Sequence, residues 1–490
     1  MSSSLSDQAL LKHLNDETQS TPEELRFSSQ NPLRTLFVQS FGPLLYNVGN
    51  AVHDALDMYI ISKALGERCL QIVGFSSIIR FLLRSFAVYF SQGAVSRVPS
   101  LIGERRQAEA SQVITDLYRL TLIAMIFMPV VFVFISKPML VFMGCTQEIA
   151  EECLSYLIPI ICVSPFTGIY QMSCGFLQSE GRSVLNGMMQ LSAFVINCGI
   201  FAPILLFWAK VQLNLAGLAF ALSQIVPSVV LLILIFNGKF NLKPSWRQWS
   251  HKFSPETLVS LKLATSFILT ILAGAFPPMV MMNFMMKAAA EVGTSSAVAN
   301  GFSVFLKIQT LVNSFSQGFS QGMLASGSYA NGAKKQRRMF LLFGWTILVT
   351  SLILLIFTPL MIFKPEWIAS FWMSNNEELD YTKLMFKIPF FTNFLNSIND
   401  TVISLLLSAT FAYSAMAPSL VRGAFYIIGA CILYYTDKTN PRRMMYVYVI
   451  NDLVVLFVDA IILIHPLKVM IGHMRKNEST TETMAAIKIP

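Results

Sequence analysis

The stretch "FSQGAVSRVPSLIGERRQ", residues 90–107, has a counterpart far downstream in "FSQGMLASGSYANGAKKQ", residues 319–336. Both stretches begin with Phe-Ser-Gln-Gly and end in glutamine. Both also have a glycine at the fourteenth place and basic residues at the sixteenth and seventeenth places. A long sequence motif that occurs twice in one chain indicates an internal duplication.

Further landmarks extend the repeat in both directions. They occur in the same order, at offsets of 227 to 230 residues: 65–76 with 292–303, Pro138 with Pro365, 143–148 with 373–378, and Ile158-Pro159 with Ile388-Pro389. Shared apolar composition alone rarely produces an ordered series at one offset. The sequence therefore predicts two homologous halves.

The composition is that of a membrane protein. Of the 490 residues, 54% are hydrophobic and 13% are charged, and the mean hydropathy is +0.57. An average soluble domain carries about 25% charged residues. The net charge of +9 is typical of basic cytoplasmic loops in so apolar a chain, so we expect no binding of nucleic acid.

The termini and the cysteines add two expectations. The first thirty residues are polar and acidic and do not resemble a cleavable signal peptide, so the first membrane span is expected to act as the signal. The seven cysteines show no metal-binding spacing. We interpret them as packing residues and expect no metal site and no cofactor.

Twelve apolar runs have the length that a bilayer demands. They lie at 35–62, 71–96, 115–136, 153–176, 184–209, 213–236, 258–287, 298–326, 339–363, 382–410, 415–436 and 443–467. The predicted organisation is an N-terminal cytoplasmic tail, an N-lobe of six spans, a cytoplasmic linker, a C-lobe of six spans and a C-terminal cytoplasmic tail, at 1–34, 35–237, 238–257, 258–467 and 468–490. Basic loops such as 103–110 and 333–338, against acidic loops at 145–152 and 375–380, place both ends in the cytoplasm.

An even number of spans in each half relates the halves by an axis along the membrane normal, which is typical of secondary transporters. We expect an all-α polytopic membrane protein of two six-helix lobes related by pseudo-twofold symmetry. A receptor, channel or scaffold is the alternative. No nucleotide-binding motif or catalytic triad is present in the sequence, so we expect no enzyme and infer that an ion gradient supplies the energy.

Several segments resemble the multidrug and toxic compound extrusion (MATE) carriers of the MOP flippase superfamily. These are "ALDMYIISKALG" (55–66), "VGFSSII" with "GERRQAEA" behind it, "FLQSEGRSVLNGMM" (176–189), "INCGIFAPIL" and "LAGLAFALSQ" (215–224). The resemblance covers about residues 36–465. The major facilitator family shares the duplicated plan, but its aspartate between spans 2 and 3 is absent between Gly93 and Gly103.

The resemblance implies acidic ion-coupling residues inside the membrane. It places Asp57 at the coupling aspartate of the first span, Asp400 at an acid of the C-lobe cavity, and Glu291 just before the valine and glycine that end span 7. A helix-end charge or a structural ion pair is the alternative for each. Buried carboxylates exchange protons near neutral pH and also bind Na⁺, so the expected coupling ion is H⁺ or Na⁺.

Other polar residues inside the spans are candidates for the substrate cavity. They are Asn197, Asn283, Arg80, Arg84, Gln92 and Gln321. Arg80 and Arg84 are four residues apart and share a helix face. A lipid-facing arginine in mid-span is costly, so they are expected to pair with acids such as Asp57 or to accept anionic solutes.

We therefore expect a monomeric antiporter, in contact with membrane lipid, that exports small organic solutes in exchange for H⁺ or Na⁺ by alternating access. Organic cations are the first expectation for its small-molecule substrate. The alternatives are an exporter of organic anions and a flippase for lipid-linked saccharide.

Overall fold

The computed structural model describes residues 22–28, 30–65, 68–142, 147–205, 213–370 and 376–487. Within these ranges the regular elements are all helical. The tail residues 1–21, the loop residues 143–146 and the residues 371–375 lie outside them. The predictions for those segments are therefore not addressed by the structure.

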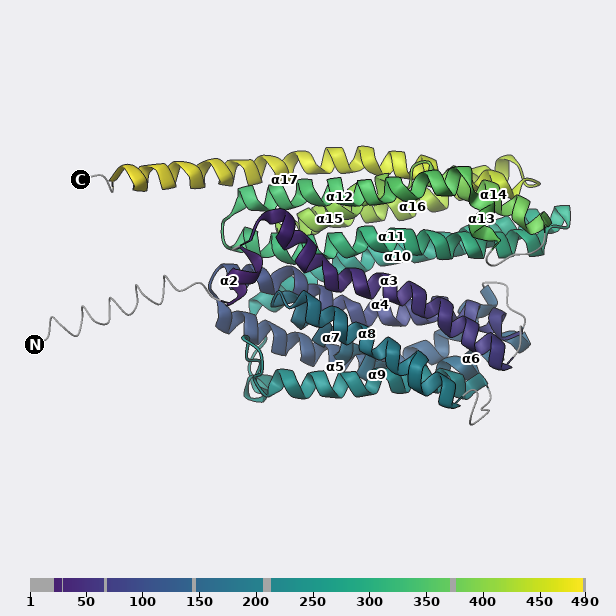
Figure 1. Cartoon of the computed structure of the whole chain (residues 1–490), viewed down its shortest axis with the longest axis horizontal. Helices are drawn as coiled ribbons and strands as arrows, with labels where there is room; N and C mark the ends of the chain where they lie inside the picture. Colours follow the sequence, from purple (N-terminus) through teal and green to yellow (C-terminus); the bar gives the residue numbers. More distant parts are fainter. Residues whose placement is uncertain are drawn as a thin grey trace, which may run out of the picture.

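Two groups of helices run alongside each other (Figure 1). After the short α2 (Pro22–Phe27), the N-lobe comprises α3 (Pro32–Leu65), α4 (Arg68–Gly103), α5 (Gln107–Phe142), α6 (Gln147–Cys162), α7 (Ser164–Ser179), α8 (Ser183–Ile196) with the π-helical turn η1 (Asn197–Phe201), and α9 (Leu213–Phe236). The linker holds η3 (Trp246–Ser250). The C-lobe comprises α10 (Pro255–Val292), α11 (Ser295–Gly332), α12 (Gln336–Phe363), α13 (Pro365–Ala369), α14 (Asn376–Phe390), α15 (Leu395–Ser408), α16 (Ala412–Thr436), η4 (Pro441–Met445) and α17 (Tyr446–Ile487).

By length and apolar composition, seven of the described helices are long enough to cross a membrane, or eight if the bent pair α6–α7 counts as one span. The remaining predicted spans correspond to α3, α4 and α11, of 34, 36 and 38 residues, and to the second pair α14–α15. Polar and charged residues lower the hydropathy of these helices. Some of these residues, such as Arg80, Arg84 and Asp400, belong to the polar sites described below.

The duplication is visible in the backbone. Arg105, after α4, and Lys334, after α11, both have a positive φ, of 62° and 57°. Gly181, after α7, and Thr410, after α15, also have a positive φ, of 74° and 66°. The members of each pair are 229 residues apart, so both lobes turn at the same places and with the same handedness.

Helix ends follow the local sequence. Ser254 caps α10 by accepting a hydrogen bond from the Glu256 backbone N–H, and Pro255 occupies the first turn. Gly293 ends the same helix in the left-handed conformation that glycine adopts without strain. The chain bends by 55° between α6 and α7, where Pro165 follows the break.

The two lobes meet along α3 and α4 on one side and α10 and α11 on the other. At one end of this interface a Cβ on Gly103 would lie 2.5 Å from the Tyr329 carbonyl oxygen of α11. The carboxyl end of α17 and the short α2 lie at this end of the molecule (Figure 1). The first and last described helices therefore begin and end on the same side of the molecule, which is the predicted cytoplasmic side.

Candidate functional site

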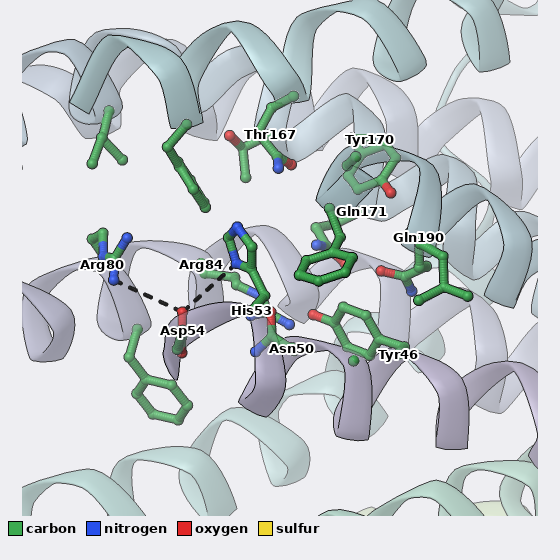
Figure 2. Close-up of a pocket in the computed structure, with 18 of the residues that line it drawn as sticks. Tyr46, Asn50, His53, Asp54, Arg80, Arg84, Thr167, Tyr170, Gln171 and Gln190 are labelled. Carbon is green, nitrogen blue, oxygen red and sulfur yellow. Dashed lines mark ion pairs between the residues drawn. The ribbon is translucent and has the colours of Figure 1, made fainter. Parts of the chain in front are cut away.

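A cavity of about 100 Å³ lies inside the N-lobe. Its wall comes from α3, α4, α7, α8 and α9, with short contributions from α6. Figure 2 shows polar side chains that converge on it from α3, α4, α7 and α8. Ionisable and polar groups gathered inside membrane-spanning helices are costly and commonly mark a functional site, so this cavity is a candidate ligand site.

Arg80 and Asp54 form an ion pair in this cavity. The Arg80 Nη2 atom lies 3.8 Å from Asp54 Oδ1, and the His53 Nδ1 atom lies 3.9 Å from the same oxygen. Arg80 also donates a hydrogen bond to the Tyr156 hydroxyl (3.2 Å), and its guanidinium lies over the Phe220 ring (5.4 Å). The Arg80 side chain is 8% exposed, against 54% for Asp54, so Asp54 faces the open part of the site.

Arg84 lies one helical turn further along α4 and also lines the cavity. Its guanidinium stacks over the Tyr46 ring of α3, at 4.6 Å from the centroid. Among the described residues no carboxylate lies within ion-pairing distance of Arg84. Of the two predicted cavity arginines, one therefore has an acidic partner and the other has an aromatic ring.

Asn197 lies behind the cavity. Its amide nitrogen is 2.7 Å from His53 Nε2, and the residue is fully buried. Asn197 begins the π-helical turn η1; such turns are frequent at functional sites. The position fixes the His53 ring, whose other nitrogen faces Asp54.

A second polar site lies inside the C-lobe, between α11, α15, α16 and α17. Arg422 of α16 donates a hydrogen bond to Asn396 Oδ1 (2.7 Å). Asn399, with its amide oxygen turned towards Arg422 Nη1 (3.2 Å), donates to Asp459 Oδ2 at 3.3 Å. Ser316 donates to Asp400 Oδ2 at 3.0 Å. Arg422 is thus linked through Asn399 to Asp459, while the predicted coupling residue Asp400 is held by Ser316.

Two aspartates of α17 join this network. Thr392 donates a hydrogen bond to Asp452 Oδ2 (2.7 Å), and Asp452 and Asp459 are 5% and 1% exposed. The charge of Arg422 acts on Asp400, Asp452 and Asp459 alike. Three carboxylates therefore lie within the electrostatic field of one guanidinium, whose direct partners are Asn396 and Asn399, and the described acids of the C-lobe site outnumber its arginine.

A third cluster of charges joins the lobes at the predicted cytoplasmic end. Arg97 of α4 donates a hydrogen bond to Glu256 Oε2 of α10 (2.8 Å), and Arg106 donates to Glu256 Oε1 (2.8 Å). Arg106 also bonds Glu109 and Glu104, and these hydrogen bonds raise the pKa of its guanidinium further above the ordinary value. Glu256 thus links the C-lobe to two arginines of the N-lobe.

Four other predicted site residues, Glu291, Asn283, Gln321 and Gln92, do not line the N-lobe cavity. Glu291 is exposed near the end of α10, Asn283 is half-buried in the same helix, and Gln321 is half-buried in α11. Gln92 is buried in α4, two turns beyond Arg84. Asp57 falls within α3, but its side chain lies outside the described part of the structure.

The structure adds residues that were not singled out from the sequence. In the N-lobe these are mainly Tyr46, Asn50, Thr167, Tyr170, Gln171 and Gln190. In the C-lobe they are Asn393, Asn396 and Asn399. The sequence did contain a pattern that could have identified some of them: polar residues at helical spacing within one span, such as positions 46, 50, 53 and 54. Among the described residues, no group of three His, Cys, Asp or Glu side chains is arranged to hold a metal ion.

A family model, described as MatE, matches residues 44–202 and 271–422. The chain belongs to the MATE family. The two matched segments fall one in each lobe, as the duplicated fold requires. No curated protein matches the chain at a significant level.

Solved structures of MATE transporters share the fold. A multidrug resistance MATE transporter of the MOP superfamily in an outward-facing conformation superposes with a TM-score of 0.83 at 16% identity, covering 92% of this chain and 99% of that one. A MOP superfamily transporter from Pyrococcus furiosus, described as having a binding pocket of reversed polarity that suggests a different function, gives 0.80 at 15% identity and covers 90% and 97%. A MATE protein in the straight conformation gives 0.81 at 16% identity, covering 93% and 100%.

Membership of the MATE family makes the chain an integral, multi-pass membrane transporter and not an enzyme. The predicted fold class, two helical lobes in the membrane, is confirmed.

Proposed function

We propose that this MATE protein exports small organic solutes in exchange for H⁺ or Na⁺. The solute binds in the N-lobe cavity, and the ion binds in the C-lobe at the carboxylates around Arg422. Both lobes belong to one chain, so a monomer contains the solute site and the ion site.

The observation that supports ion coupling is the shared arginine. Asp400, Asp452 and Asp459 together would carry three negative charges against the single positive charge of Arg422. Unpaired carboxylates are costly inside a membrane, so the excess is balanced by bound protons or by a bound inorganic cation. A site whose charge balance requires such an ion is suited to couple its movement to transport.

Alternating access requires that the contacts between the lobes form and break. The Glu256 pairs with Arg97 and Arg106 join the lobes at the predicted cytoplasmic end. In this arrangement the cytoplasmic side is held closed. Binding of ion or solute then shifts the balance between this state and one in which the pairs are broken.

Transport by purified protein in liposomes tests the proposal. A pH gradient or a sodium gradient is imposed, and the movement of fluorescent organic cations and of aromatic carboxylates is followed. We expect gradient-driven transport by the wild type, lost in Asp400→Asn and in Asp57→Asn. Which gradient drives it identifies the ion.

The matched control is Asp437→Asn. Asp437 is an acid outside the membrane whose carboxylate accepts hydrogen bonds from Thr439 within its own loop, so its loss should leave transport unchanged. Absence of transport under both gradients would reject an ion-coupled exporter. It would favour a flippase, which liposomes with labelled lipid-linked saccharide would detect.

A further inference from the structure

Arg84 has surroundings that suit the binding of an anion. It is residue 17 of the 36 in α4 and therefore lies near the middle of the membrane. Arg80, one turn away, has Asp54 as its counter-ion, whereas Arg84 has the Tyr46 ring. The described residues that line the cavity include two arginines but a single carboxylate, that of Asp54. One positive charge is therefore left without an acidic partner among them.

A guanidinium inside a membrane without a counter-ion is unfavourable, and such residues commonly mark a substrate pathway. A cation–π contact with a tyrosine ring only partly replaces the lost hydration. No described side chain neutralises the charge of Arg84. An anion bound in the cavity would do so.

Unused hydrogen-bonding atoms in the same wall support a ligand. The Tyr46 hydroxyl and the Gln190 side-chain oxygen are buried, line the cavity and have no hydrogen-bond partner among the described residues. Buried polar atoms are nearly always satisfied in folded proteins. The Tyr46 hydroxyl is a donor on the residue that stacks against Arg84, so both groups can act on one acceptor.

The rest of the lining indicates the shape of the solute. Phe81, Phe194, Phe220 and Tyr170 contribute aromatic surface, which suits a planar apolar body. The volume of about 100 Å³ is of the same order as a cavity that holds one benzene ring. The space fits a small aromatic acid better than a bulky one.

We propose that the N-lobe cavity binds small aromatic carboxylates, with the carboxylate on Arg84 and the Tyr46 hydroxyl and the ring among the aromatic side chains. This reverses the first expectation of organic cations. The proposal rests on the proposed function for its role in transport, but the binding itself is measured without transport.

Three probes with one ring and different charge test the site: benzoate, neutral benzamide and cationic benzamidine. Binding to the purified full-length protein in nanodiscs is measured at equilibrium by titration calorimetry. We expect benzoate to bind at least tenfold more tightly than the other two. Arg84→Gln should weaken benzoate binding at least tenfold, Arg84→Lys should retain part of it, and Tyr46→Phe should weaken it severalfold.

Arg337→Gln is the matched control, because it removes an exposed arginine at the start of α12 and should leave benzoate binding unchanged. Thermal unfolding of each variant shows whether it is folded, and Arg84→Lys keeps the test decisive if Arg84→Gln is not. Tighter binding of benzamidine, no benzoate binding by the wild type, or equal binding by wild type and folded Arg84→Gln would overturn the proposal.

Failure of the two proposals can be told apart. Benzoate binding that depends on Arg84, without transport of any solute under a gradient, would retain the anion site and reject the exporter. Transport that persists with no benzoate binding would retain the exporter and reject the anion site.

Discussion

Gly332, the last residue of α11, packs directly against the backbone carbonyl of Ser100 in α4, across the boundary between the two lobes. Its counterpart in the repeat, Gly103, packs in the same way against Tyr329 of α11. The two copies of the repeated glycine, Gly103 and Gly332, therefore lie at the same contact between the lobes. Each lets the helix of the other lobe approach closely.

A methyl group at Gly332 should separate the lobes at this end. Gly332→Ala places a Cβ where the Ser100 carbonyl oxygen lies, and overpacking of this kind costs about 1–3 kcal/mol. That cost corresponds to a shift of roughly 5- to 150-fold in the equilibrium between closed and open states. Distances between spin labels on Lys239 and Arg337, both exposed at this end, should lengthen.

The control for this variant is Gly344→Ala in α12, where an added Cβ meets nothing within 4 Å. Label distances in the control should match the wild type. Unchanged distances in Gly332→Ala would mean that the glycine contact does not hold the lobes together.

Glu256→Gln should weaken the same closure by a different route. It removes the carboxylate that bonds Arg97 and Arg106 from the opposite lobe, and loss of a partly buried charged partner costs about 1–3 kcal/mol. We expect a larger open population in the spin-label measurement. Glu109→Gln, whose partner Arg106 belongs to its own lobe, should have a much smaller effect, and equal effects would contradict the assignment.

Thr410→Gly should stabilise the protein, and the reverse exchange Gly181→Thr should destabilise it. Thr410 is exposed and has a φ of 66°, which is strained for a β-branched residue; the strain amounts to about 1–3 kcal/mol, partly offset by the greater freedom of glycine in the unfolded chain. A Cβ on Gly181 would also lie 3.0 Å from the Phe27 ring. Thermal unfolding in detergent measures both, and shifts of the same sign would be evidence against this explanation.

Arg422→Gln should be strongly destabilising, because it leaves Asp400, Asp452 and Asp459 without their shared cation. Breaking a buried charge network costs about 3–5 kcal/mol. Adding Asp459→Asn should restore part of the loss, so a double-mutant cycle should give a clear interaction energy. Strictly additive effects would show that Arg422 and Asp459 act independently.

Arg442→Gln provides the comparison for this cycle. Arg442 pairs with the exposed Asp380 at 3.1 Å, and surface pairs contribute at most about 1 kcal/mol. Its thermal unfolding should therefore stay close to that of the wild type.

Much of the fold could be predicted because a membrane-spanning helix is recognisable from the residues of its own segment. Spans follow from runs of apolar residues, and the duplication follows from words repeated at one offset. The helices that carry function were harder to count by hydropathy, since α3, α4 and α11 contain the polar residues of the sites. The apolar runs at 35–62, 71–96 and 298–326 nevertheless located these three helices, and the repeat related the first lobe to the second.

Individual residues of the sites could also be named from the sequence, since charges such as Arg80, Arg84 and Asp400 are costly inside a membrane. The partner expected for the arginines was Asp57, whose side chain lies outside the described part of the structure, and the described ion pair of Arg80 is with Asp54 instead. Asp452 and Asp459 share a helix face, but nothing along the chain shows that both of them and Asp400 lie within the electrostatic reach of Arg422, from the preceding helix.

The sequence by itself determined that this protein is a duplicated, two-lobed membrane carrier with charges inside its spans. Only the tertiary structure decided how those charges are balanced: Asp54 is placed against Arg80 and leaves Arg84 to the Tyr46 ring, while three acids share Arg422. The physical reason is that a charge in low-dielectric surroundings is governed by neighbours within a few ångströms, and those neighbours come from different helices.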